Sequence, residues 1–150
     1  MSADAKGAEA ERRIALSLES VEDFEFRVRF AEVPYGGLTI DEPLPVGQSK
    51  GPDPSRLLAA AVGGCLSASL LFAARKLRLN VQGMHTDVKV EHRRNERGRL
   101  RIGKIEVQIA PAIHEPDQTQ LKRCLELFED FCVVTQSVRS GIEVSVNVRT

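Results

Sequence analysis

The sequence predicts one α+β domain built around a single long, buried helix. Residues 57–74 carry no charged side chain, which is typical of a helix surrounded by protein. Segments before and after them alternate apolar and polar residues with the period of half-buried strands. A later stretch repeats apolar residues every three or four positions, which predicts a second helix. A length of 150 residues fits one domain.

The composition is that of an ordinary globular protein, with 42% hydrophobic and 28% charged residues. Lys plus Arg and Asp plus Glu both number 21, so the net charge is zero. This argues against non-specific nucleic-acid binding, which needs a strongly basic face. We interpret the one basic run, residues 92–99, as the solvated tip of a hairpin.

Residues 1–22 have no apolar core of a signal peptide, and we expect a flexible lead-in followed by one folded domain over residues 23–150. Three cysteines, an odd number, do not suggest a secreted disulfide framework. We therefore expect a cytoplasmic protein that binds neither a membrane nor a nucleic acid.

Residues 24–33 alternate as a strand, with Phe24, Phe26, Val28 and Phe30 on one face. The glycines at 36–37 predict a turn, and residues 38–40 begin the return strand. Residues 42–54 are rich in proline and glycine, which predicts a long loop.

The long helix is expected to begin with Asp53 as its N-cap and Pro54 in its first turn, and to end near Leu77. Its lack of charge would also suit a membrane span, but its many small residues favour a core helix. Gly63 and Gly64 each cost about 1 kcal/mol relative to Ala in a helix, so we expect a close neighbour there. Two explanations of this glycine pair stay open: tight packing of the helix against a sheet, and a passage for a substrate.

After the helix, residues 81–94 and 100–109 predict two strands joined by a turn at 95–98, with a bulge near Gly103. Pro116 opens a second helix. Its expected inner face consists of Leu121, Cys124, Leu125, Phe128 and Cys132. Residues 133–139 predict a short helix closed by Gly141, and residues 142–148 a final strand. One sheet covers only one side of the long helix, so we expect a second copy of the chain to cover the other, forming a homodimer.

Two of the three cysteines are candidates for chemistry, namely Cys65 in the long helix and Cys132 at the break after the second helix. Cys124 lies on the expected apolar stripe and is interpreted as a packed residue. On a continuous helix Cys124 and Cys132 would be about 12 Å apart, too far for a disulfide, so any bridge should involve Cys65. The histidines are scattered, and no metal or nucleotide motif occurs.

Two segments resemble the OsmC-like family, which includes the organic hydroperoxide resistance proteins. Residues 54–65, PSRLLAAAVGGC, resemble its cysteine helix, and residues 131–138, FCVVTQSV, resemble its second cysteine segment. The order of the elements also matches, over roughly residues 24–149. The resemblance implies an OsmC-like fold of antiparallel sheets around a long central helix, in an intertwined homodimer.

It further implies a thiol peroxidase in which Cys65 attacks an organic or hydrogen peroxide and Cys132 resolves the sulfenic acid as a disulfide. No cofactor is implied beyond an external dithiol reductant. A thiolate within a helix is too far from that helix's own N-terminus to be stabilised by it, so we expect a cationic donor.

Peroxidases of the family use an arginine of the N-terminal strand region, for which Arg27 and Arg29 are candidates here, and a glutamate before the cysteine helix. That glutamate position is Ser55, followed by Arg56. The family's Arg–Glu pair is therefore not intact; either Arg56 takes over as donor or the activity is weak. Two other functions stay open: a small-molecule-binding or redox-sensing dimer without turnover, and a structural stress-related protein whose cysteines are only packed.

Overall fold

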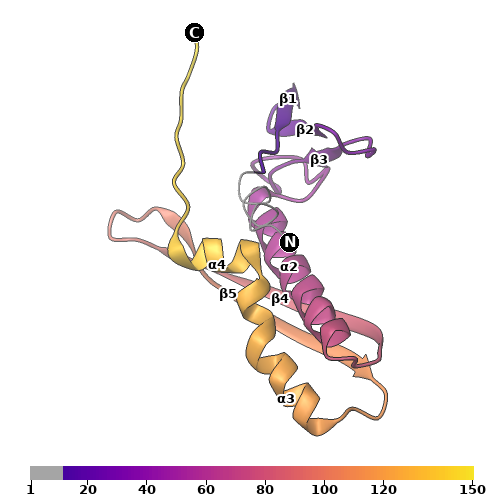
Figure 1. Cartoon of the computed structure of the whole chain (residues 1–150). Coiled ribbons are helices and arrows are strands. Elements are labelled where there is room, and N and C mark those ends of the chain that lie inside the picture. The colour runs from indigo at the N-terminus through magenta and orange to yellow at the C-terminus, as the bar shows by residue number, and fades with distance from the viewer. Residues whose placement is uncertain (1–11) are drawn as a thin grey trace. The chain divides into compact units, whose positions relative to one another are not determined.

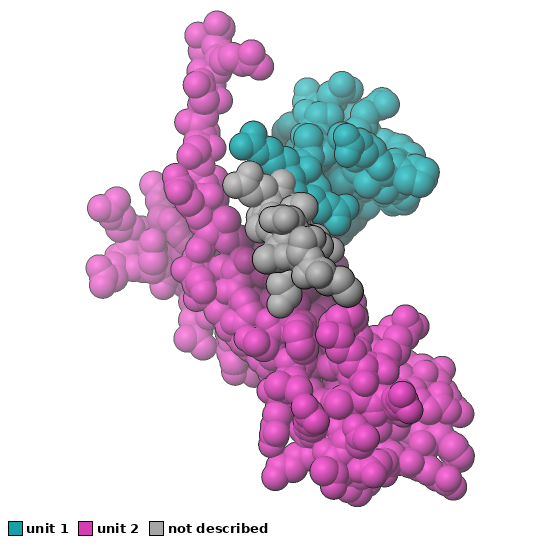
Figure 2. Space-filling model, viewed as in Figure 1, with its two compact units in different colours: residues 1–54 teal, residues 55–150 magenta. Residues whose placement is uncertain are grey.

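A computed structural model describes residues 12–150, which divide at Pro54 into two compact units, Met1–Pro54 and Ser55–Thr150 (Figures 1 and 2). The first unit contains a sheet of three strands, β1 (Leu16–Glu22), β2 (Glu25–Phe30) and β3 (Leu38–Ile40). The strands are antiparallel and adjacent in chain order. The second unit contains the helices and the remaining strands.

Strand β1 lies within residues 1–22, where we expected a flexible lead-in; residues 1–11 of that segment lie outside the described residues. Leu16 and Leu18 alternate with the polar Ser17 and Glu19, which is the pattern of a strand, and β1 pairs from Leu16 onward with β2. Strand β2 is shorter than the predicted 24–33, and Phe24, expected on its apolar face, lies outside it and is 50% exposed. Within β2 the predicted alternation is confirmed, with Val28 buried and Arg27 and Arg29 exposed.

The long loop after β3 is organised around one buried carboxylate. Asp41 is 2% exposed, and its Oδ2 accepts the backbone N–H groups of Gln48 and Lys50, each at 3.1 Å. Two glycines let the loop close. A methyl group on Gly51 would lie 2.2 Å from the carbonyl oxygen of Thr39, and one on Gly47 would lie equally close to a carbonyl oxygen of the loop. The loop is therefore compact despite its length.

Helix α2 (Pro54–Lys76) begins at the predicted proline and ends one residue before the predicted Leu77. One side of it is buried, including Val62, Leu66 and Leu70. Within residues 12–150 it is the one helix long and apolar enough to cross a membrane, and 44% of its apolar window is buried. The residues at 60, 61, 64, 68 and 72 of the same helix are exposed.

The prediction of a close neighbour at the two glycines is correct for Gly63. A methyl group there would lie 2.6 Å from Val88 Cγ2, so Gly63 permits tight packing of α2 against β4. A methyl group on Gly64 would meet nothing within 4 Å. Tight packing of the helix against the sheet therefore explains Gly63 and not Gly64.

Strands β4 (Val81–Arg94) and β5 (Leu100–Ile113) form a two-stranded antiparallel ribbon beside α2 (Figure 1). The register shifts where Glu91 faces Lys104 and His92 faces Ile102, which leaves Gly103 as the extra residue. The predicted bulge is therefore confirmed. Strand β5 runs four residues further than the predicted end at 109.

The C-terminal part forms α3 (Gln118–Leu127), a 3-10 turn η1 (Phe128–Phe131) and α4 (Val133–Ser140). Asp117 caps α3 by accepting the N–H of Gln120 at 3.0 Å. Leu125 was expected on the inner face, but its side chain is 50% exposed. Cys132 was expected on the same helical stripe, but it lies beyond η1 as the N-cap of α4, because the chain turns there.

The strand predicted over residues 142–148 does not form in the single chain. The segment is extended and leaves the other elements of its unit (Figure 1). Its apolar side chains are 63–81% exposed: Ile142, Val144, Val146 and Val148. The prediction of a strand is therefore wrong for the single chain: a strand needs a hydrogen-bonding partner as well as the alternation, and none of the described residues supplies one.

Two apolar clusters hold the second unit together. The first joins Leu70, Ala73 and Ala74 of α2 to Cys124 of α3. The second joins Val62 and Leu66 of α2 to Cys132, with partly buried residues of β5 and α4 around it. This second cluster contains the candidate site.

Candidate functional site

Cys65 and Cys132 come together although 66 positions separate them in the chain. Cys65 lies in the middle of α2 and is half-buried, whereas Cys132 is fully buried at the start of α4. The Cys65 thiol donates a hydrogen bond to Cys132 Sγ. Both are free thiols. The packing of α4 onto α2 thus places the two sulfur atoms side by side.

The N-terminus of α4 supplies hydrogen-bond donors to both sulfurs. The N–H of Val134 donates to Cys65 Sγ, and the N–H of Thr135 donates to Cys132 Sγ at 3.4 Å. Thr135 Oγ1 lies 3.0 Å from Cys132 Sγ and accepts from the thiol. Ser69, buried one turn beyond Cys65 on α2, hydrogen-bonds both sulfurs. The cation expected beside Cys65 stays a prediction; what the structure places there is the N-terminus of a different helix, α4, with its positive end of the helix dipole.

These contacts act on the two thiols in opposite directions. Burial raises the pKa of Cys65, and its hydrogen bond to Cys132 raises that pKa further, so it lies above the ordinary value. Burial would also raise the pKa of Cys132. Hydrogen bonds from Cys65, Thr135 and Ser69 outweigh burial, and the pKa of Cys132 is lowered. When the pair loses its first proton, the negative charge therefore lies mainly on Cys132 Sγ.

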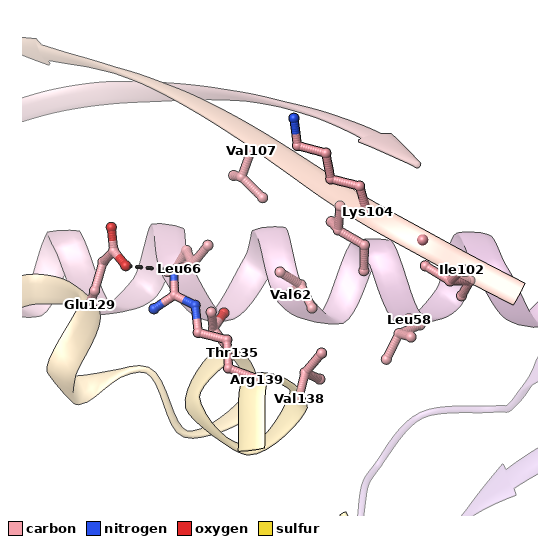
Figure 3. A pocket seen from close by; sticks show the side chains of 12 residues that line it. Leu58, Val62, Leu66, Ile102, Lys104, Val107, Glu129, Thr135, Val138 and Arg139 are labelled. Carbon is pink, nitrogen blue, oxygen red and sulfur yellow. Dashed lines mark hydrogen bonds and ion pairs between the residues drawn. The ribbon is translucent and has the colours of Figure 1, made fainter. Parts of the chain in front are cut away.

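A cavity of about 460 Å³ opens between α2, β5 and α4 (Figure 3). Neither cysteine of the pair lines it, but Val62 and Leu66, which pack against Cys132, do. Leu58, Val62 and Leu66 form the α2 wall, one helical turn apart. Thr135 lines the cavity as well as contacting Cys132. At its rim Arg139 and Glu129 form an ion pair at 2.7 Å, drawn as a dashed line in Figure 3. The lining combines apolar side chains with the charged Lys104, Glu129 and Arg139, and the cavity has a size suited to a small organic molecule.

Cys124 is separate from this pair. It is fully buried in the other cluster, its Sγ lies 3.9 Å from the carbonyl oxygen of Leu70, and burial raises its pKa. Its interpretation as a packed residue agrees with this position.

The predicted arginines lie in three places. Arg27 Nη2 donates to the carbonyl oxygen of Gly36 at 3.1 Å, and its Nη1 lies 3.4 Å from Thr39 Oγ1. Arg29 is exposed on β2 of the first unit, and Arg56 is exposed in the first turn of α2. Their assistance to Cys65 stays a prediction.

Ser55, which stands where the family has glutamate, is paired with a histidine. Its Oγ lies 3.0 Å from Nε2 of His92, near the end of β4. Ser55 therefore offers a neutral hydroxyl that already has a partner, and not a carboxylate.

Sequence reasoning missed Ser69 and Thr135. Each had a signal: Ser69 follows Cys65 by four residues on a helix, and Thr135 follows Cys132 by three at a helix start. No group of His, Cys, Asp and Glu side chains within residues 12–150 is suited to holding a metal ion.

Fold and site together define a class of protein: an α+β protein in which a cysteine of a long helix meets a second cysteine at the start of a short one. A family model described as OsmC-like protein matches residues 47–147, more than half of the chain. The chain belongs to the OsmC-like family. No curated protein matches its sequence.

Several solved structures share the fold. An OsmC-like protein of unknown function from Vibrio cholerae superposes with a TM-score of 0.73 at 15% identity, over 85% of this chain and 94% of that one. An organic hydroperoxide resistance protein from Elizabethkingia anophelis, crystallised with thiocyanate, gives 0.65 at 16% identity, over 90% and 94%. A protein of the same description from Legionella pneumophila gives 0.61 at 14% identity, over 87% and 91%. At identities this low, the structural similarity establishes the α+β fold and nothing further.

Proposed function

We propose that the protein is a cysteine-based peroxidase that reduces organic hydroperoxides through Cys65 and Cys132. The observation that carries the proposal is the hydrogen bond between these two sulfurs. Family membership and the names of two structural relatives are consistent with it. The apolar α2 wall of the cavity, Leu58, Val62 and Leu66, favours an organic peroxide over hydrogen peroxide.

The reaction proceeds in two steps. The Cys65 thiolate attacks the outer oxygen of the hydroperoxide, the O–O bond breaks, and the leaving alkoxide takes a proton to become an alcohol. Cys65 is now a sulfenic acid. Cys132 attacks its sulfur, forms the disulfide and releases hydroxide, which becomes water. An external dithiol then restores both thiols by exchange.

The test is to mix the reduced protein with one equivalent of cumene hydroperoxide, count free thiols and locate any disulfide by mass spectrometry. We expect the loss of two thiols, joined as Cys65–Cys132, and equimolar cumyl alcohol. Cys65→Ser should abolish alcohol formation, and Cys124→Ala, the matched control, should leave it unchanged. Retention of all three thiols would contradict the proposal.

We also propose that the working form is a homodimer. Two apolar surfaces of the single chain are exposed: the small-residue side of α2 around Ala61, Gly64 and Ala68, and the alternating segment at 142–148. Segment 142–148 has strand geometry without a strand partner, and a second copy has the same unpaired groups to offer.

Sedimentation velocity tests the dimer with a pair of neighbouring substitutions. Val146→Asp places a charge on the apolar face of the segment, and Ser145→Asp places the same charge on the other face. We expect a dimer for the parent and for Ser145→Asp, and dissociation for Val146→Asp. A monomeric parent would refute the dimer.

The cavity also favours a second candidate, a ligand-binding or redox-sensing protein without turnover. In that case apolar ligands bind stoichiometrically, and peroxide consumption stops at one equivalent even with excess dithiol present. Repeated turnover with dithiothreitol distinguishes the peroxidase from this alternative.

A further inference from the structure

The reduced cysteine pair is held by contacts that treat its two sulfurs differently. Cys132 Sγ receives the N–H of Thr135 at 3.4 Å and contacts the Thr135 hydroxyl at 3.0 Å. Both groups belong to one residue in the first turn of α4, with Cys132 as N-cap. A side chain in the N-cap position accepts the unpaired amides of the first turn, and here the acceptor is sulfur.

We propose that Thr135 is a further catalytic residue, which holds Cys132 as the resident thiolate of the reduced pair. As a thiol, Cys132 donates to Thr135 Oγ1. Once the thiol is deprotonated the contact reverses, because the hydroxyl can rotate and donate to the anion. The thiolate then accepts the amide and the hydroxyl of Thr135, and the thiol of Cys65.

Among the described residues of the second unit, the groups that contact Cys132 are apolar side chains and hydrogen-bond donors. From α2 it faces Val62 and Leu66 besides Cys65 and Ser69, and the β5 residues in its cluster are apolar. η1 carries two carboxylates, Glu129 and Asp130, and Glu129 is paired with Arg139 of α4. Among these described groups the anion is therefore stabilised by hydrogen-bond donors and the end of α4 rather than by an adjacent guanidinium. The lowered pKa of Cys132 agrees with this geometry.

This gives Cys132 a part in each step of the proposed reaction, on which the inference rests. The pair shares one proton, which passes from Cys65 to Cys132 and leaves the Cys65 thiolate to attack the hydroperoxide. The departing alkoxide takes the proton from Cys132 and becomes the alcohol. Cys132 is again a thiolate held by Thr135; it attacks the sulfenic sulfur, the S–S bond forms, the S–O bond breaks, and hydroxide leaves. The singly deprotonated cysteine pair thus reacts with one hydroperoxide to give the disulfide, one alcohol and one hydroxide.

The test begins without peroxide, so its outcome does not depend on the proposed activity. In a Cys124→Ala background, the thiolate of the reduced protein is titrated by its ultraviolet absorbance. Thr135→Val keeps the shape and the backbone N–H but removes the hydroxyl, and Thr135→Ser restores a hydroxyl. We expect Thr135→Val to raise the first thiolate midpoint by about one unit, which is tenfold in thiolate fraction, and Thr135→Ser to match the parent. Cys65→Ser should keep a low-pH thiolate and Cys132→Ser should lose it.

With cumene hydroperoxide, Thr135→Val should slow disulfide formation about tenfold at neutral pH, with the loss recovered at higher pH. Coinciding titrations of Thr135→Val and the parent would overturn the inference, as would a low-pH thiolate that survives Cys132→Ser. If Thr135→Val does not fold, Thr135→Ala gives the same comparison. Should the parent consume no peroxide, the proposed activity fails while the titration still decides the role of Thr135.

Discussion

Gly63 offers the sharpest test of how α2 is packed. Gly63→Ala adds a methyl group 2.6 Å from Val88 Cγ2, closer than carbon atoms approach in proteins. Overpacking of this kind costs about 1–3 kcal/mol. Removing a glycine from a helix interior returns about 1 kcal/mol, so the net loss of stability should be about 1 kcal/mol. Val88 is β-branched and has few alternative rotamers, so it cannot move aside cheaply.

The cost depends on one side chain, and a double-mutant cycle isolates it. Val88→Ala alone should lose about 1–2 kcal/mol through the removed methyl groups. In that background Gly63→Ala should change sign and stabilise by about 1 kcal/mol, because only the helix term remains. Urea unfolding followed by circular dichroism, at one fixed protein concentration, measures all four proteins. Additive effects, or a Gly63→Ala protein as stable as the parent, would refute the packing argument.

Three further predictions concern the other clusters. Cys124→Ala should lower the free energy of unfolding by about 1 kcal/mol, since it removes a buried sulfur beside Leu70, and peroxide-driven thiol loss should stay at two. Gly51→Ala should destabilise by about 2 kcal/mol or more, because its methyl group meets the carbonyl oxygen of Thr39 and not a movable side chain; parent-like thermal unfolding would contradict this. Burial would raise the pKa of Asp41, but the backbone N–H groups of the loop lower it below its ordinary value of 3.8. Asp41 therefore stabilises the fold above that value and loses this effect as pH falls through the lowered pKa, so the stability gap between the parent and Asp41→Asn should close in acid.

The sequence was most informative where local chemistry and periodicity agreed. Pro54 and the uncharged run after it predicted α2 to within a residue at its end, and the break in phase at Gly103 predicted the bulge. It was least informative where an element depends on a partner. Residues 142–148 alternate as a strand should, yet hydrogen-bonding partners are not encoded in the segment itself.

The site shows the same division. Cys65 and Cys132 stood out through their setting and their resemblance to a family, and Cys124 through its helical stripe. Ser69 and Thr135 did not stand out, because serine and threonine near a cysteine are common and gain significance only when both sulfurs are placed. Cys132 was wrongly assigned to the helical stripe because the chain leaves the helical period at η1; Leu125, within α3, is 50% exposed in the single chain.

By itself, the sequence determined the α+β class, the long apolar helix and which two thiols to compare, since these follow from patterns within short stretches of chain. Only the tertiary structure decided that the first backbone N–H groups of α4 donate to the sulfurs of both Cys65 and Cys132. It also decided that the pKa of Cys132 is the lower of the two. The physical reason is that acidity depends on the donors and the burial around an atom, and these come from residues far apart in the chain.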